Sequence, residues 1–214
     1  MASVQNIAKQ ALRKSIQDKL GSLSLENVQE QSNNVAQKLL SMEAYKNSKV
    51  VSVYLSTAGE LSTIEILKRM FMDNKEVFVP TYKGEIMEMV QLNGMDDYER
   101  LPVTKWNIKQ PKISDKRINA LSKGGIDLIL LPGVAFTIEG DRCGHGRGYY
   151  DKYLKRYFEL FPEKYAENMP LEDKAKNGKT ILIGLALKEQ IVKKDELPLD
   201  EHDFPLDVVL FDEN

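Results

Sequence analysis

The order of apolar and polar positions divides the chain into alternating strands and helices. Short apolar runs predict strands over residues 50–55, 76–81, 87–92, 126–131, 180–187 and 208–211. Helical spacing of apolar residues predicts helices over 3–20, 24–41, 63–71 and 149–161, and a short helix over 188–194. This alternation predicts an α/β fold: a single domain with a central, mostly parallel sheet flanked by helices on both faces.

Three segments need separate comment. The run 126–131 is the most strongly apolar, which predicts a central strand buried on both faces. Residues 96–117 contain two X-Pro steps and the lone Trp106, and we expect irregular structure there. Trp106 fits a lid over a ring-shaped ligand and a plug of the core equally well. Residues 161–179, with two prolines and many charges, predict a surface excursion.

The first helix combines an apolar stripe with a basic pair. Ser3 is the expected cap, and Gly21 is placed to end the helix. Lys9 and Arg13 are four residues apart and therefore lie on the same side of the helix. This spacing alone indicates a basic surface exposed to solvent. The expected core side consists of Ile7, Ala8, Ala11, Leu12, Ile16 and Leu20.

Composition narrows the class of protein. The length of 214 residues fits one domain, 1–214, and a net charge of −2 argues against a nucleic-acid binder. Cys143 is the only cysteine, which excludes an internal disulfide and fits a reducing compartment. There is no apolar run long enough to span a bilayer and no secretory signal, so we expect a cytoplasmic protein. The basic N-terminus leaves a mitochondrial transit segment as the alternative.

A glycine-rich stretch between the strand 126–131 and the helix 149–161 indicates chemistry. Gly144, Gly146 and Gly148 stand at alternate positions, with Arg142 and Arg147 beside them. Such glycines let backbone N–H groups approach a ligand, and a following helix adds the positive end of its dipole. The stretch is neither a Walker loop nor a dinucleotide fingerprint, and a tight turn is the alternative. With the cations and the helix start, it predicts phosphate binding.

The ends of the predicted strands bring further candidates to the same edge. Ligands of open parallel sheets bind beyond the carboxyl ends of the strands, where residues 56–60, the glycine stretch and the acidic loop 200–203 fall. Asp151, in the first turn of its helix, suits either the helix dipole or a Mg²⁺ ion, with Asp203 or Glu201 as a second ligand. There is no Cys/His/Asn pattern to support a nucleophilic Cys143, and His202 fits a surface residue.

These residues resemble the 5-formyltetrahydrofolate cyclo-ligase family, also called methenyltetrahydrofolate synthetases. The likeness follows nearly the whole chain, and the matching segments are Lys9 with Arg13, 55–60, 106–108 with 110–111, 131–133 with Phe136, 142–151, 185–190 and 203–211. The chain departs from the family in having Cys143 where leucine is usual and His145 where the animal-type proteins have arginine. The excursion 161–179 is longer than in many members.

The resemblance implies an ATP-dependent ligase that closes 5-formyltetrahydrofolate to 5,10-methenyltetrahydrofolate and releases ADP and phosphate. It implies that ATP is held by Lys9, Arg13, Arg142, Cys143, Gly144, His145, Gly146, Arg147, Gly148, Tyr149 and Tyr150. It implies a folate pocket of Leu55, Glu60, Trp106, His145, Gly146, Arg147, Gly148 and Tyr149. Catalytic roles fall on Arg142, Arg147 and Tyr149, and Mg²⁺ on Asp151 and Asp203.

Small molecules are the expected partners, without nucleic acid or membrane, and we expect a monomer. A non-catalytic folate- or nucleotide-binding protein of the same fold is the alternative, because His145 replaces an expected donor. A sugar-phosphate isomerase-like enzyme is a third possibility on fold analogy alone.

Overall fold

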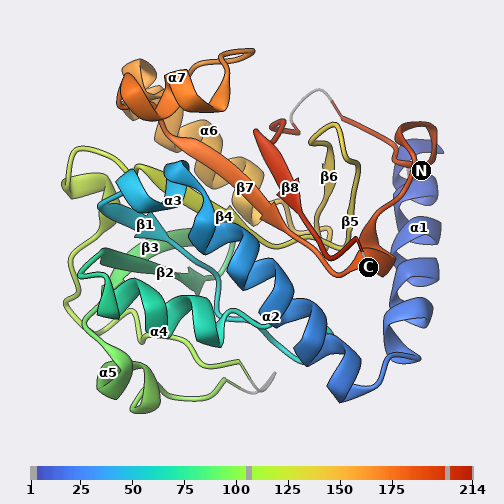
Figure 1. Cartoon of the computed structure of the whole chain (residues 1–214), viewed down its shortest axis with the longest axis horizontal. Helices are drawn as coiled ribbons and strands as arrows, with labels where there is room; N and C mark the ends of the chain where they lie inside the picture. The colour runs from blue at the N-terminus through green and yellow to red at the C-terminus, as the bar shows by residue number, and fades with distance from the viewer. Residues whose placement is uncertain (1–3, 105–107, 201–202, 214) are drawn as a thin grey trace.

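The structure is a computed structural model, and it describes residues 4–104, 108–200 and 203–213. Its centre is a six-stranded sheet in the order β3-β2-β1-β4-β7-β8 (Figure 1). All neighbouring strands are parallel except β2 and β3, which form an antiparallel hairpin. The strands are β1 (Val50–Ser52), β2 (Glu76–Lys83), β3 (Ile86–Leu92), β4 (Leu128–Leu131), β7 (Ile181–Leu185) and β8 (Val208–Leu210). The predicted fold class is confirmed.

Helices cover both faces of this sheet. In Figure 1, α2 and α4 lie in front of the sheet and α6 lies behind it, while α1 stands beside the end at which β7 and β8 finish. Each of the four residues of β4 is buried, as expected for a central strand between two helical layers. The helices are α1 (Val4–Gly21), α2 (Leu25–Ser41), α3 (Glu43–Asn47), α4 (Ile64–Met72), α5 (Met95–Glu99), α6 (Tyr149–Leu160) and α7 (Leu171–Lys176).

Two strand boundaries differ from the prediction. β1 ends at Ser52. Shortly after it, the carbonyl oxygen of Tyr54 accepts a hydrogen bond from the Thr63 hydroxyl instead of from a neighbouring strand. β2 continues through Pro80 to Lys83, although proline usually ends a strand. The pairing of β2 with β1 stops at Phe78, so at Pro80 only β3 lies alongside β2. The N–H that proline lacks is therefore not needed for hydrogen bonds to β1.

The predicted core side of α1 is wrong for Ile7, Ala8 and Ala11 and confirmed for Leu12, Ile16 and Leu20, which pack in one small cluster. Ile7 is 58% exposed, and Ala8 and Ala11 are exposed as well. The buried face also includes Lys9, which was not expected there, because the helix packs on a small cluster of Val134, Ala135, Cys143 and Leu197. The basic pair that spacing placed in solvent therefore turns toward the protein. The expected cap, Ser3, lies outside the described residues.

The two segments without a predicted element contain short helices. The segment 96–117, expected to be irregular, overlaps α5, and Trp106 lies outside the described residues. The surface excursion 161–179 contains α7, whose Lys174 is 6% exposed and pairs with Asp207 at 2.5 Å. Asp207 also accepts the N–H of Leu182 in β7, so the excursion secures the start of β8. Within the described residues, no helix is long and apolar enough to cross a membrane.

Candidate active site

A two-stranded hairpin presents the glycine stretch at the carboxyl end of the sheet. Ala135 and Phe136 form β5 and pair with β6 (Arg142–Cys143), close to α1 in Figure 1. The hairpin turn is held by Thr137, whose Oγ1 accepts the N–H of Asp141 at 3.1 Å. The sequence does not predict this hairpin, because two-residue strands are too short to show an alternating pattern. β6 leads directly into Gly144.

The glycine loop, Gly144–Gly148, ends at the N-terminus of α6. Gly146 has φ +93° and Gly148 has φ +63°, a left-handed conformation that residues with a Cβ rarely adopt. Gly148 is the N-cap of α6 and supplies no side-chain hydrogen bond to its first turn. The first N–H groups of the helix therefore meet no capping side chain, and together with the helix dipole they favour an anion.

Arg13 joins α1 to this loop. Its Nε donates to the carbonyl oxygen of Gly144 at 2.8 Å. The guanidinium lies so close to Gly146 that a Cβ there would stand 3.4 Å from the Arg13 Cζ. Arg13 makes no other hydrogen bond within the described part of the chain, so its outer N–H groups remain for a ligand.

Lys9 is buried and fully engaged by the acidic loop. Its Nζ lies 2.7 Å from Oδ2 of Asp200 and 2.7 Å from Oδ2 of Asp203. Burial lowers the pKa of Lys9, but the hydrogen bonds and charges of the two carboxylates outweigh it, so the pKa is raised overall. Lys9 therefore connects α1 to the acidic loop, whose residues 201 and 202, including Glu201 and His202, lie outside the described residues.

The two arginines of the glycine stretch have opposite surroundings. Arg142 is 5% exposed; its Nη2 pairs with Oδ1 of Asp151 at 2.5 Å and its Nη1 donates to the carbonyl of Pro132 at 3.3 Å. Arg147 is exposed and has no hydrogen bond or ion pair with the described residues. Arg142 is thus paired inside the protein beneath the loop, whereas Arg147 is open to solvent at the loop itself.

Glu60, in the connection that follows β1, places its carboxylate beside the glycine loop. Its Oε2 accepts from the N–H of Thr57 at 2.8 Å and from the Thr57 hydroxyl at 3.0 Å. Its Oε1 lies 3.8 Å from Nε2 of His145, whose side chain is 59% exposed. Leu55, on the same connection, is 8% exposed and packs in the main core. The carboxylate is therefore held in place on one oxygen and faces the loop with the other.

Two adjacent tyrosines at the start of α6 have different roles. The Tyr149 ring lies 4.8 Å from the Tyr82 ring, and its hydroxyl donates to the carbonyl of Gly84 in the β2–β3 turn at 2.7 Å. Tyr150 is buried with its ring centroid 5.8 Å from the Arg142 guanidinium, and burial raises its pKa. Tyr149 therefore connects the start of α6 to the β2–β3 turn, and Tyr150 is buried beside Arg142.

Cys143 belongs to the core beneath the loop. It is 1% exposed and packs with Ile16, Val134 and Leu197. Burial raises the pKa of its thiol, which keeps it protonated and unsuited to nucleophilic attack. The Cys143 side chain therefore serves as an apolar core residue, and only its backbone is placed to meet a ligand.

The site residues that sequence reasoning missed are partners of the predicted ones. Thr57 fixes Glu60, Asp200 shares Lys9 with Asp203, and Tyr82 packs on Tyr149. The acidic loop was a signal for Asp200. Thr57 and Tyr82 have no distinguishing pattern, because their roles arise from contacts between separate strand ends.

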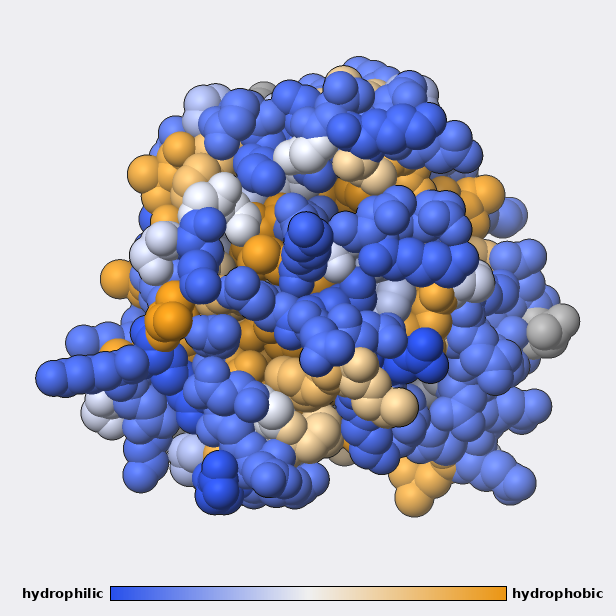
Figure 2. Space-filling model, turned by 60° about the vertical axis from the view of Figure 1, so that its left-hand side comes forward, coloured by the Kyte–Doolittle hydropathy of each residue, from blue (hydrophilic) through white to orange (hydrophobic). Residues whose placement is uncertain are grey.

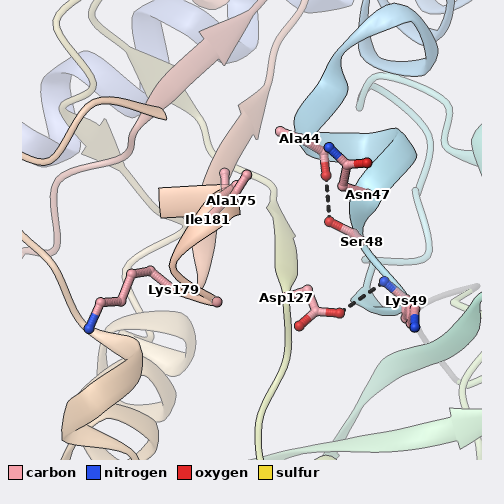
Figure 3. A pocket seen from close by; sticks show the side chains of 9 residues that line it. Ala44, Asn47, Ser48, Lys49, Asp127, Ala175, Lys179 and Ile181 are labelled. Carbon is pink, nitrogen blue, oxygen red and sulfur yellow. Dashed lines mark hydrogen bonds between the residues drawn. The ribbon is translucent and has the colours of Figure 1, made fainter. Parts of the chain in front are cut away.

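A cavity of about 210 Å³ lies at the opposite end of the sheet (Figure 3). Lys49, Asp127 and Ile181 line it where β1, β4 and β7 begin, and Asp127 accepts the N–H of Lys49 at 2.9 Å. The Lys179 side chain points away from Asp127 in Figure 3. The face in Figure 2, which turns the left side of Figure 1 forward, is mostly hydrophilic, with hydrophobic residues showing chiefly between hydrophilic ones. These features give no chemistry to rival the glycine loop.

The fold and this geometry fit one class: an α/β enzyme with a site suited to an anion at the carboxyl end of its sheet. A family model described as the 5-formyltetrahydrofolate cyclo-ligase family matches residues 5–212. A mouse 5-formyltetrahydrofolate cyclo-ligase is 39% identical, covering 100% of this chain and 98% of that protein. A Caenorhabditis elegans protein, named as a probable member, is 37% identical over 99% of this chain and 96% of its own length.

Solved structures agree. The Aquifex aeolicus 5,10-methenyltetrahydrofolate synthetase is 29% identical with a TM-score of 0.71, covering 96% of this chain and 90% of that one. A Mycoplasma pneumoniae protein of the same name, 20% identical with a TM-score of 0.66 over 96% of this chain and 99% of that one, shares the fold. The chain belongs to the 5-formyltetrahydrofolate cyclo-ligase family. The family and the names of these relatives indicate a cyclo-ligase rather than an isomerase.

Proposed function

We propose that the chain closes 5-formyltetrahydrofolate to 5,10-methenyltetrahydrofolate between the glycine loop and Glu60. The formyl oxygen is a poor leaving group. Transfer of the γ-phosphoryl group of ATP to that oxygen releases ADP and makes the oxygen part of a good leaving group. N10 then attacks the activated carbon, the ring closes, and the carbon–oxygen bond breaks to release phosphate. The protein must mainly position two substrates and neutralise charge.

The triphosphate side consists of the glycine loop and the cations around it. The N–H groups of Gly144–Gly148 and of the first turn of α6 form an anion site without a capping side chain. Arg13 reaches it from α1, and Arg147 is exposed without another partner in the described chain. His145 is exposed at the same loop and donates a hydrogen bond to an anion in either charge state. Arg147 is the cation we assign to the transferring phosphoryl group.

The folate side consists of Glu60, Leu55 and Tyr149. Glu60 is placed to accept from the amino and N–H donors of the pterin through Oε1, because Thr57 holds its Oε2. The Tyr149 ring lies where the loop meets the β2–β3 turn and offers a face to the folate. Trp106, the remaining expected contact, stays a prediction because it lies outside the described residues.

One observation supports this arrangement above the others. His145 of the glycine loop and Glu60 of the β1 connection lie 3.8 Å apart, although 85 positions separate them in the chain (145 − 60). The loop expected to bind phosphate and the Glu60 carboxylate expected to bind the folate are thus neighbours. Transfer of a phosphoryl group between two bound substrates requires such proximity.

Lys9 and Arg142 fit the site in revised roles. Lys9 is paired with both carboxylates of the acidic loop, so its contact with the triphosphate would require an exchange of partners. Arg142 is buried against Asp151, and we assign it to holding the loop in shape rather than to touching a phosphate. Cys143 contributes only backbone groups to the site, and the buried ring of Tyr150 packs beneath it.

The donor set fits a Mg²⁺ ion bound together with ATP. No cluster of three or more His, Cys, Asp or Glu side chains suited to a metal occurs in the described chain. Mg²⁺ bound with phosphates needs only one or two carboxylates. Oδ1 of Asp151 and Oδ2 of Asp203 each hold a basic side chain, which leaves one oxygen of each carboxylate to hold the ion. The ion would supply charge neutralisation of the phosphate oxygens.

The test is formation of the methenyl product. Purified protein with Mg²⁺, ATP and 5-formyltetrahydrofolate should increase the absorbance of 5,10-methenyltetrahydrofolate and release one ADP per product. Omitting ATP should stop both. Tight folate binding by calorimetry without ADP formation would instead identify the non-catalytic binding protein and overturn the proposed reaction.

We further propose that the enzyme acts as a cytoplasmic monomer on small molecules alone. A 26% identical relative from Arabidopsis thaliana, of which this chain covers 73%, is named as mitochondrial. Here the N-terminal segment forms α1 and holds the glycine loop through Arg13, which is a structural use for its basic residues. Light scattering should give the mass of one chain, and a fluorescent fusion at the C-terminus should not stain mitochondria.

A further inference from the structure

The segment that follows β7 lies against the hairpin that supports the glycine loop. The N–H of Val192 donates to the carbonyl oxygen of Phe136 at 2.9 Å, and Phe136 forms an isolated parallel bridge with Ile191. The turn before it, Lys188–Gln190, belongs to a stretch that resembles the family, yet the chemistry described above assigns it no role. Its side chains show what it contributes.

Gln190 places a carboxamide between this turn and the chain that enters the hairpin. The residue is 3% exposed. Its Nε2 donates to the carbonyl oxygens of Gly133 at 2.6 Å and Val134 at 3.2 Å, and its Oε1 accepts the N–H of Leu187 at 2.9 Å. A glutamine amide has two N–H donors, so both serve the backbone just before β5.

The hydrogen bonds continue from Gln190 to the glycine loop. Val134, whose carbonyl Gln190 holds, donates its own N–H to the carbonyl oxygen of Cys143 at 2.8 Å. Cys143 is the last residue of β6 and is followed directly by Gly144, which accepts from Arg13. A shift of the chain at Val134 therefore moves the start of the glycine loop relative to α1 and α6.

We propose that Gln190 is a positioning residue of the glycine loop, fixing where the loop amides stand without touching either substrate. The inference rests on the proposed role of that loop in binding the triphosphate. Phosphoryl transfer depends steeply on placement, since a misplacement of about 1 Å costs ~10²-fold in rate. The folate side depends on Gln190 much less, because within the described residues the hydrogen bonds that Glu60 accepts come from Thr57.

Gln190→Met tests this with little change of volume, because methionine fills the space but donates no hydrogen bond. We expect kcat/KM for ATP to fall on the order of 10–100-fold. The Kd for 5-formyltetrahydrofolate, measured without ATP, should stay close to the wild-type value. The rise in melting temperature that ATP produces should shrink, while the rise that the folate produces should persist.

Thr180→Val is the matched control for lost stability. Thr180 is 1% exposed, and its Oγ1 donates to the carbonyl of Ile126 at 2.6 Å at the opposite end of β7. We expect a comparable fall in melting temperature with catalytic constants near wild type. Gln190→Asn, which keeps the amide but shortens its reach, should reduce kcat/KM for ATP in the same direction and serves if Gln190→Met does not fold.

Several results would overturn the role of Gln190. These are a folded Gln190→Met or Gln190→Asn with wild-type kcat/KM for ATP, an equal loss in Thr180→Val, or folate affinity falling as far as ATP affinity. Absence of ATP-dependent turnover in the wild-type protein would overturn the proposed function instead, so the two failures are distinguishable.

Discussion

Replacing Arg147 by alanine should lower the catalytic rate, whereas replacing Arg142 should lower the stability of the fold. The two arginines are only five positions apart in the chain (147 − 142). Arg147 is exposed and has no partner in the described chain, so Arg147→Ala should change the free energy of unfolding by less than about 0.5 kcal/mol. Removing a donor that stabilises developing charge costs on the order of 10²-fold in kcat, equivalent to ~2.7 kcal/mol in the barrier.

Arg142→Ala should primarily lower the stability of the folded protein. The variant leaves Asp151 without its cation and the Pro132 carbonyl without a donor. Breaking a buried ion pair costs ~3–5 kcal/mol, and because the Asp151 side chain is 20% exposed, we expect a loss near ~3 kcal/mol. Such a loss is a large share of the stability of a domain.

Urea unfolding and product absorbance separate the two effects. Arg147→Ala should unfold at the wild-type urea concentration and turn over slowly, whereas Arg142→Ala should unfold at a lower concentration. Arg147→Lys, which keeps the charge but loses the planar fork, should recover part of the rate. Wild-type kinetics in Arg147→Ala, or equal destabilisation by both substitutions, would refute the distinction drawn from burial.

Two further outcomes follow from the contacts of the site. Lys9→Met should lower the free energy of unfolding by roughly 2–3 kcal/mol near neutral pH, because two carboxylates lose their cation and one of them is 46% exposed. Since the folded-state pKa of Lys9 is raised above 10.5, its contribution is present below that pH and is lost as pH rises through the raised pKa. The gap between wild type and Lys9→Met in urea titrations should therefore narrow at higher pH, and a constant gap would contradict the pairing. Tyr149→Phe removes only the hydrogen bond to Gly84, and we expect KM for the folate to rise roughly fivefold, equivalent to ~1 kcal/mol, with kcat little changed. Steady-state kinetics that show a fall in kcat instead would assign the hydroxyl a chemical role.

The sequence was sufficient for the order of the elements and for the place of the glycine loop in the fold. Strands with apolar runs and helices with 3.6-residue spacing are local patterns, and they were found close to their predicted bounds. The glycine stretch could be recognised because its signal, alternate glycines between a strand and a helix, is also local. The predicted end of β1 was wrong because a side chain from outside the strand bonds to the backbone there. The Thr63 hydroxyl donates to the carbonyl oxygen of Tyr54.

The buried face of α1 could not be predicted from periodicity. Ile7 and Ala8 fit an apolar stripe as well as Ile16 does, and spacing does not tell which face meets the protein. The choice depends on the hairpin cluster and on Asp200 and Asp203, which are distant in the chain. A lysine whose charge is matched by two carboxylates can be buried, and only the tertiary structure supplies them.

By itself the sequence determined an α/β domain with a glycine-rich loop at the carboxyl end of a mostly parallel sheet, because period and glycine spacing act within a few residues. Only the tertiary structure decided the role of each charged side chain in that loop. Arg142 and Arg147 have the same chemistry, and they differ because Asp151 and Pro132 enclose one of them while the other is left in solvent. Burial and pairing depend on residues brought together from separate strand ends, which no local pattern records.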